Sequence, residues 1–90
     1  MSWSFVKPPD FRKQALVLPK SARRKLTDVM TQLSLAENPN ILGKKKLTKY
    51  GELHFINLSD SYRLSYNVDF KAHEIIINRV GSHIHVYGKD

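Results

Sequence analysis

The 90-residue sequence contains no cysteine, so it forms neither disulfide bonds nor thiolate metal sites, and a reducing compartment suits it. It also has no apolar run that approaches the roughly 20 residues needed to span a bilayer. Its first residues, MSWSFVKPPD, do not have the basic-then-apolar layout of a signal peptide. We therefore expect a soluble, cytoplasmic protein with no membrane contact.

Acidic residues are also scarce in this sequence. Eight Asp and Glu stand against fifteen Lys and Arg, which gives a formal net charge of +7. On so small a surface this field favours polyanions, whose counterions are released on contact. Because the basic residues cluster, we expect a nucleic acid or an acidic protein as partner, rather than a charge that serves only solubility.

The length predicts one small domain over residues 1–90, which buries roughly 60% of the surface that its unfolded chain exposes. Such a thin core favours a shallow groove on a sheet face over a deep enclosed pocket. The sequence shows no internal repeat and no second domain.

The first half of the chain predicts a strand and two helices. Residues 2–7 alternate as a strand does, and the two prolines that follow end it. Asp10 is placed to cap a helix that starts near Phe11, and Pro19 breaks this helix. A second helix is predicted from near Ser21, because apolar residues recur there at helical spacing and form one stripe: Ala22, Leu26, Val29, Met30 and Leu33.

A basic segment with four lysines follows the second helix, and we expect it to be a loop. Its lysines are Lys44, Lys45, Lys46 and Lys49. They could be a solvated linker, or they could clamp an RNA backbone without reading its sequence. We assign them, together with Arg79, to RNA or ribosome binding.

Four strands are predicted in the rest of the chain, over residues 53–58, 62–68, 74–80 and 84–87. The adjacent Phe55 and Ile56 hint at a bulge, and Gly81 allows a bend before the last strand. The run Ile75-Ile76-Ile77 is apolar on both faces, as in a central strand. The predicted fold is therefore α+β: an N-terminal strand and a helical hairpin packed on a largely antiparallel, twisted sheet of four to five strands.

The alternation of the strands predicts a polar site on the sheet face away from the helices. If the apolar residues of strand 62–68 face the helices, Arg63 faces away; if Leu53 and Phe55 also point inward, His54 joins it. By the same parity His83, His85 and Tyr87 lie on this open face. Such a set suits cleavage of RNA, which needs a base for the 2′-hydroxyl, a cation for the phosphorane and an acid for the leaving oxygen.

Each of these side chains could instead be an ordinary surface residue. A zinc site built on His83 and His85 lacks a convincing third ligand, so we expect neither a metal nor another cofactor. His73 lies beside a turn, and we assign it no role.

Three segments of the chain resemble the RelE/ParE superfamily of type II toxin–antitoxin toxins. They are LPKSARRKLTDVMTQL, SYRLSYNV and INRVGSHIHVY, and the resemblance extends from about residue 5 to residue 87. It implies a RelE-like fold and one of two activities. RelE-like members are ribosome-dependent endoribonucleases that cut mRNA, whereas ParE-like members bind DNA gyrase and are not nucleases.

The resemblance to the RelE-like branch also suggests roles for single residues. Arg63 stands where an arginine stabilises the transition state, and Tyr87 stands where a tyrosine acts as base. His83 is nearest to the place where an arginine acts as general acid. Other ribonuclease branches have a histidine near the C-terminus, where His85 stands. His54 and Ile56 occupy the places of a phosphate-gripping lysine pair, a departure from the pattern.

We therefore expect a metal-independent mRNA interferase, neutralised by a cognate antitoxin and acting on the ribosome with its mRNA and 16S rRNA. Contact with operator DNA is expected only through the antitoxin complex. The alternatives are a ParE-like gyrase inhibitor and a plain RNA-binding module.

Overall fold

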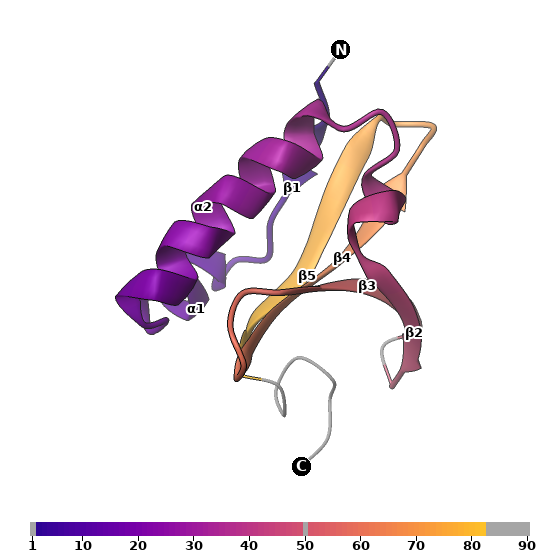
Figure 1. The fold of residues 1–90 in the computed structure, drawn as a ribbon. Coiled ribbons are helices and arrows are strands. Elements are labelled where there is room, and N and C mark those ends of the chain that lie inside the picture. Colours follow the sequence, from indigo (N-terminus) through magenta and orange to yellow (C-terminus); the bar gives the residue numbers. More distant parts are fainter. Residues whose placement is uncertain (1, 50, 83–90) are drawn as a thin grey trace.

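The structure of the chain is a computed structural model that describes residues 2–49 and 51–82. Five strands form one sheet in the order β1-β5-β4-β3-β2, in which β1 pairs with β5 in parallel and the other pairs are antiparallel. Both α-helices lie on one side of this twisted sheet (Figure 1). The predicted α+β class is thus confirmed. The elements are β1 (Ser4–Val6), α1 (Phe11–Leu16), α2 (Lys20–Leu35), the 3-10 helix η1 (Pro39–Leu42), β2 (Lys44–Thr48), β3 (Gly51–Asn57), β4 (Tyr62–Asp69) and β5 (Glu74–Ser82).

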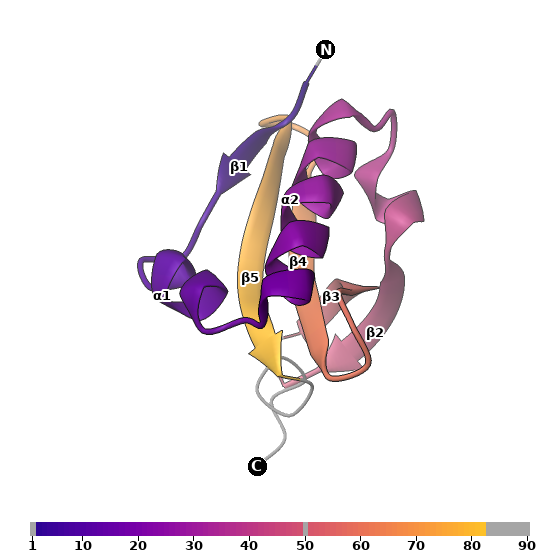
Figure 2. The ribbon, with the colours of Figure 1, turned by 60° about the vertical axis from the view of Figure 1, so that its left-hand side comes forward.

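Helix α2 supplies most of the helical part of the core. Four residues of its predicted apolar stripe are buried and Met30 is partly buried, in one core with Leu64, Ile75 and Val80. Figure 2 shows α2 lying along β4 and β5, while the shorter α1 lies beside the C-terminal half of β5. No helix among the described residues is long and apolar enough to cross a membrane.

The N-terminal segment is held in place by Trp3. Its backbone N–H donates to the carbonyl of Ser34 at 2.9 Å, and its indole N–H donates to the carbonyl of Ala36 at 2.8 Å. The indole also stacks on the ring of His73, with centroids 3.8 Å apart. Trp3 therefore ties β1 to the end of α2 and to the β4–β5 turn, and so places β1 along the first half of β5.

Several local predictions are wrong. The lysine segment is a strand and not a loop: β2 pairs with β3 from Lys44 to Thr48 and forms an edge of the sheet. Exposed lysines are typical of such edges because they discourage pairing with another chain. Strand β5 runs through Gly81 without ending there, and Asp10 stands at the N-cap of α1 without a side-chain hydrogen bond. The strand predicted over residues 84–87 lies outside the described residues.

The bulge lies in β5 and not in β3. Residue Ser65 pairs with Arg79 and Tyr66 pairs with Ile77, so Asn78 is an extra residue without a partner. The hydroxyl of Ser65 donates to the side-chain oxygen of Asn78 at 2.9 Å. Ile77 and Val80 are three positions apart, a spacing that would put them on opposite faces of a regular strand. Because of the extra residue, both are buried in the helix-side core.

Strand β5 occupies a central place in the sheet, between β1 and β4, as its three consecutive isoleucines predicted. However, only Ile75 and Ile77 are buried. Ile76 is 38% exposed, so the face away from the helices is not sealed at this position.

Candidate functional site

The face of the sheet opposite the helices carries four of the candidate residues that the structure describes, Arg63, Arg79, Lys44 and Lys46, and we call it the far face. Residues that pair directly in an antiparallel sheet point to the same side. Lys44 pairs with Phe55, Phe55 with Ser65, and Ser65 with Arg79, so these four form one row across the sheet. Adjacent rows and the bulge complete the far face. Toward β2 and the β3–β4 turn its members are Lys44, Lys46, Leu53, Phe55, Asn57, Arg63, Ser65, Asn78 and Arg79, and toward the β4–β5 turn it continues with Asn67, Asp69, Glu74 and Ile76.

The prediction that His54 lies beside Arg63 is wrong. His54 pairs with Tyr66, and its ring lies 5.7 Å from the ring of Tyr66, which is buried in the helix-side core. Arg63 pairs with Asn57 on the far face. The error came from assuming that Leu53 and Phe55 point toward the helices, whereas Ile56 does so.

The position of Arg63 is fixed by the β3–β4 turn. One guanidinium nitrogen, Nη1, donates to three carbonyl oxygens: those of Ser59 at 2.6 Å, Tyr62 at 3.1 Å and Asp60 at 3.2 Å. Nη2 takes no part in these bonds. Within the part of the chain that the structure describes, Arg63 forms no ion pair, so its positive charge is held in place but not neutralised by a carboxylate.

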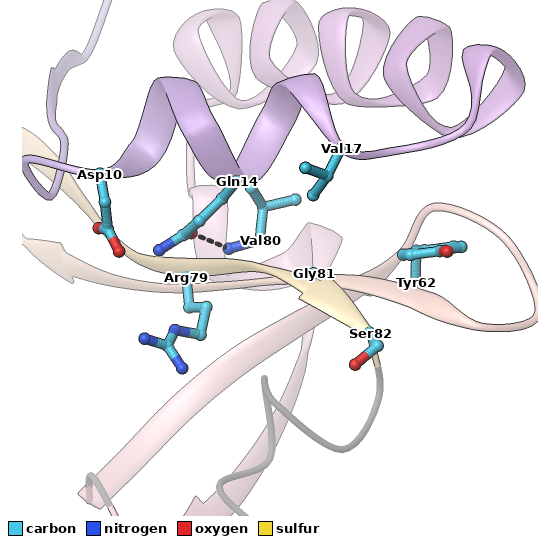
Figure 3. Close-up of a pocket in the computed structure, with 8 residues that line it drawn as sticks. All are labelled: Asp10, Gln14, Val17, Tyr62, Arg79, Val80, Gly81 and Ser82. Atoms are coloured by element: carbon cyan, nitrogen blue, oxygen red, sulfur yellow. Dashed lines mark hydrogen bonds between the residues drawn. The ribbon is translucent and has the colours of Figure 1, made fainter.

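Arg79 is the second cation of this part of the far face. Arg63 pairs with Gly81 while Arg79 pairs with Ser65, so the two arginines are diagonal neighbours on one face. Such neighbours are about 7–8 Å apart, which is within reach of a shared phosphate for long side chains. Figure 3 shows the Arg79 side chain leaving β5 on the side away from α1. Among residues 2–49 and 51–82 no carboxylate pairs with it.

The predicted lysine set does not stay together. Lys44 and Lys46 lie on the far face, whereas Lys45 pairs with His54 and points to the other side. There its ammonium lies 3.9 Å from the carboxylate of Glu52, and both side chains are more than 60% exposed. An exposed pair of this kind contributes little to stability.

The far face also carries an apolar patch, formed by Leu53 and Phe55, that is separate from the main core. Phe55 is only 5% exposed. An aromatic ring needs a free face to stack on a nucleotide base, so Phe55 is not a stacking platform. Recognition on this face has to rely on its charges and hydrogen-bond donors.

A cavity of about 500 Å³ lies at the edge of the sheet, between α1 and the C-terminal half of β5. Gln14 of α1 points into it, and its side-chain oxygen accepts the backbone N–H of Val80 at 2.9 Å (Figure 3). The short β1 pairs only with residues 74–76 of β5, so the backbone N–H of Val80 has no strand beside it and is bonded by Gln14 instead. Gln14 was missed in the sequence, because nothing marks a glutamine in a short helix as the cap of a distant strand.

Burial and charge affect two titratable groups near the row of His54. Burial, and then the positive charge of Lys45, lower the pKa of His54, while Glu52 acts in the opposite direction. Burial raises the pKa of Tyr66 to about 12. Tyr66 is therefore a neutral hydrogen-bond donor at ordinary pH and not a base.

The predicted acid and base residues His83, His85 and Tyr87 follow directly after β5 and lie outside the described residues. A zinc site on His83 and His85 would also lie outside the described residues. Within residues 2–49 and 51–82 no three His, Asp or Glu side chains are grouped so as to hold a metal ion.

No family model matches the chain, and no curated protein matches it in sequence. Solved structures do match. A mutant of the E. coli toxin RelE in the free state has a TM-score of 0.72 and 20% identity, and covers 99% of this chain and 94% of its own. The archaeal RelE–RelB complex from Pyrococcus horikoshii has a TM-score of 0.71 and 22% identity, and the match covers 91% of this chain and 96% of its own.

The toxin–antitoxin complex RelBE2 from Mycobacterium tuberculosis gives a TM-score of 0.62 and 16% identity, covering 92% of this chain and 100% of its own. The chain thus has the fold of RelE toxins, and the fold predicted from the three sequence segments is confirmed. At these identities the likeness establishes the fold, and the activity has to be argued from the site.

Proposed function

We propose that this chain, which has the RelE fold, is the toxin of a type II toxin–antitoxin system and cuts mRNA on the ribosome. The observation that carries the proposal is the pair Arg63 and Arg79. The two arginines are diagonal neighbours on the far face, and neither forms an ion pair with a described residue. Two guanidinium groups so placed suit the non-bridging oxygens of one phosphodiester.

The proposed reaction is attack of a ribose 2′-oxygen on the adjacent phosphorus. A base takes the 2′-hydroxyl proton, the new O–P bond forms, and the bond to the 5′-oxygen breaks as an acid protonates that oxygen. Arg63 stabilises the charge of the phosphorane, and Arg79 holds the phosphate. Tyr87, His83 and His85 are the candidates for base and acid, as the family resemblance implies. His54, on the other face, is left out.

The neutralising partner in this proposal is a cognate antitoxin, because two of the similar structures are RelE chains in complex with RelB or within RelBE2. The gyrase-inhibitor alternative is not favoured, since the similar structures are RelE toxins and RelBE complexes.

The test is cleavage of a defined message on programmed ribosomes by purified variants. Arg63→Ala should slow cleavage by about 10²–10⁴, as should Tyr87→Phe if the tyrosine is the base. Arg63→Gln separates the two roles of Arg63, because its amide can still donate to the turn carbonyls but carries no charge. It should be as slow as Arg63→Ala while melting at a higher temperature.

Lys71→Ala is the matched control, because it removes an exposed cation from the β4–β5 turn. It should cleave at the wild-type rate. Two results would overturn the proposal: folded wild-type protein that never cuts ribosome-bound mRNA, or expression that collapses DNA supercoiling while translation continues.

A further inference from the structure

A second concave surface lies on the outer side of α1, away from the far face. It is a groove of about 430 Å³ between residues 7–9, α1 and the start of α2. Its floor includes Phe11, Ala15 and Leu16, and its cations are Lys7, Arg12 and Arg23. Nothing in the proposed reaction uses this groove.

The floor of the groove is apolar and partly open to solvent. Leu16 is 58% exposed, although Phe11 and Ala15 pack against the core. The volume is within the range of about 300–1,000 Å³ that is usual for binding clefts, but near its lower end. It suits one or two apolar side chains. The two prolines of residues 7–9 restrict the backbone there, so the groove needs little ordering to receive them.

The charged residues that line the groove are of one sign, although Asp10 stands in the chain between the lining residues Pro9 and Phe11. Its lining contains three cations and no carboxylate. None of the three forms an ion pair with a described residue, and the ammonium of Lys7 lies 5.7 Å from the ring centroid of Phe11. The first turns of α2 extend the positive surface with further exposed basic residues: Lys20, Arg24 and Lys25.

We propose that this groove docks an acidic, amphipathic segment of a partner protein, whose apolar side chain fills the floor while its carboxylates meet Lys7, Arg12 and Arg23. The charge alone would also suit RNA. The apolar floor favours a peptide, because a phosphodiester backbone has no apolar side chain to bury there. Taking this partner to be the antitoxin rests on the proposed function.

The groove and the far face are separate surfaces. Helix α1 stands between them, with Phe11 and Leu16 toward the groove and Gln14 toward β5. A segment bound in the groove therefore does not need Arg63 or Arg79, and peptide binding can be measured independently of cleavage.

The test is fluorescence anisotropy with a labelled, alanine-based helical peptide that carries several glutamates and two leucines at i and i+4. The double variant Arg12→Glu/Arg23→Glu should bind it at least about tenfold more weakly than wild type, because two attractions become repulsions. Leu16→Ser should bind several-fold more weakly. As controls, Lys71→Glu reverses one exposed cation elsewhere, and Leu47→Ser makes the change of Leu16→Ser at an exposed site of β2. Both should bind like wild type.

A second peptide, with both leucines changed to serine, and a short oligo(U) strand complete the experiment. The proposal is overturned if the serine peptide binds as tightly, if Leu16→Ser has no effect, or if oligo(U) displaces the leucine peptide and depends on the same residues. Cleavage by the groove variants should stay at the wild-type rate. A wild-type protein that binds the peptide but never cleaves mRNA would refute the nuclease and leave the groove intact.

Discussion

Tyr66 is the largest fully buried side chain among the described residues, and its hydroxyl is the polar group that burial has to satisfy. The hydroxyl donates to the carbonyl of Pro39 at 2.6 Å. This bond joins the middle of β4 to η1, the only short helix between α2 and β2 in the described chain. The same burial raises the pKa of Tyr66 to about 12, so the bond persists over the ordinary pH range.

Removing this hydroxyl leaves the carbonyl of Pro39 without its partner. We expect Tyr66→Phe to lower the free energy of unfolding by about 1–3 kcal/mol, the usual range for a buried acceptor left unpaired. Tyr62→Phe is the control, because no hydrogen bond of its hydroxyl is present among the described residues. Urea denaturation measures both. Equal stability of the two variants would contradict the role given to the bond.

His54 predicts a dependence of stability on pH. Its pKa is lowered, first by burial and then by Lys45, so the folded protein resists protonation of this ring. The unfolded chain binds the proton as pH falls below about 6.5, so the free energy of unfolding should decrease on acidification from about pH 7.5 to about pH 5. The decrease should be smaller in His54→Asn. Thermal melts across this range provide the measurement, and parallel pH curves for the two proteins would refute the assignment.

At the scale of elements, the join between η1 and β2 is closely packed. A Cβ atom at Gly43 would lie 2.6 Å from the hydroxyl oxygen of Tyr66 and 3.2 Å from the Cβ of His54. A methyl group does not fit there unless β2 or the Tyr66 ring shifts. Gly43, just before β2, is therefore a position where the backbone packs directly against Tyr66 of the core.

We expect Gly43→Ala to cost about 1–3 kcal/mol of stability, as overpacking of a filled site usually does. Gly51→Ala is an informative comparison, because nothing lies within 4 Å of its added Cβ and its cost comes from the positive φ of 94° alone. In a background of Tyr66→Phe, which removes the closest atom, Gly43→Ala should cost less. Additive effects of the two changes would argue against the close contact.

The helical half of the fold could be predicted from the sequence more fully than the sheet. The apolar stripe of α2 is long and periodic, and Pro19 marks the start of the helix. An error of one or two residues in its bounds therefore changes neither the helix nor its buried side. A strand has a period of two, so a single wrong assumption reverses a whole face. In β3 the neighbours Phe55 and Ile56 are both apolar, and periodicity alone could not decide which of them faces the helices.

The candidate site was predictable to a similar extent. Arg63 was placed correctly on the far face, because the alternation of β4 from Leu64 to Tyr66 is regular. For Arg79 the sequence predicts RNA binding but not the side of the sheet on which it lies. The extra residue Asn78 reverses the alternation of β5, and nothing in the sequence indicates this bulge. Lysine-rich sequence was interpreted as a loop because edge strands and basic loops share a composition.

At the scale of the whole molecule, the net charge of +7 is divided between the far face and the helical side. Lys44 and Lys45 are adjacent in sequence but point to opposite sides of β2. Binding of a single-stranded RNA to the far face should therefore depend on one and not on the other.

We expect Lys44→Gln to reduce the slope of log K against log salt by about 0.7, the contribution of one phosphate contact on a single strand. Lys45→Gln should leave the slope unchanged, although both variants have the same net charge. Binding of a short RNA at several salt concentrations gives both slopes. Equal reductions would show that the net charge, and not the far face, attracts the RNA.

The strand order also limits the order in which the strands can pair while the chain is being synthesised. Ser4 pairs with Glu74, and β5 separates β1 from β4 in the sheet. While the chain is being synthesised from its N-terminus, β1 has no neighbour until β5 has been made, and β2, β3 and β4 can form only part of a sheet. Arg79 belongs to that same late strand. The two arginines of the far face therefore come together only when the sheet itself is completed, and a partly made chain cannot present them as a pair.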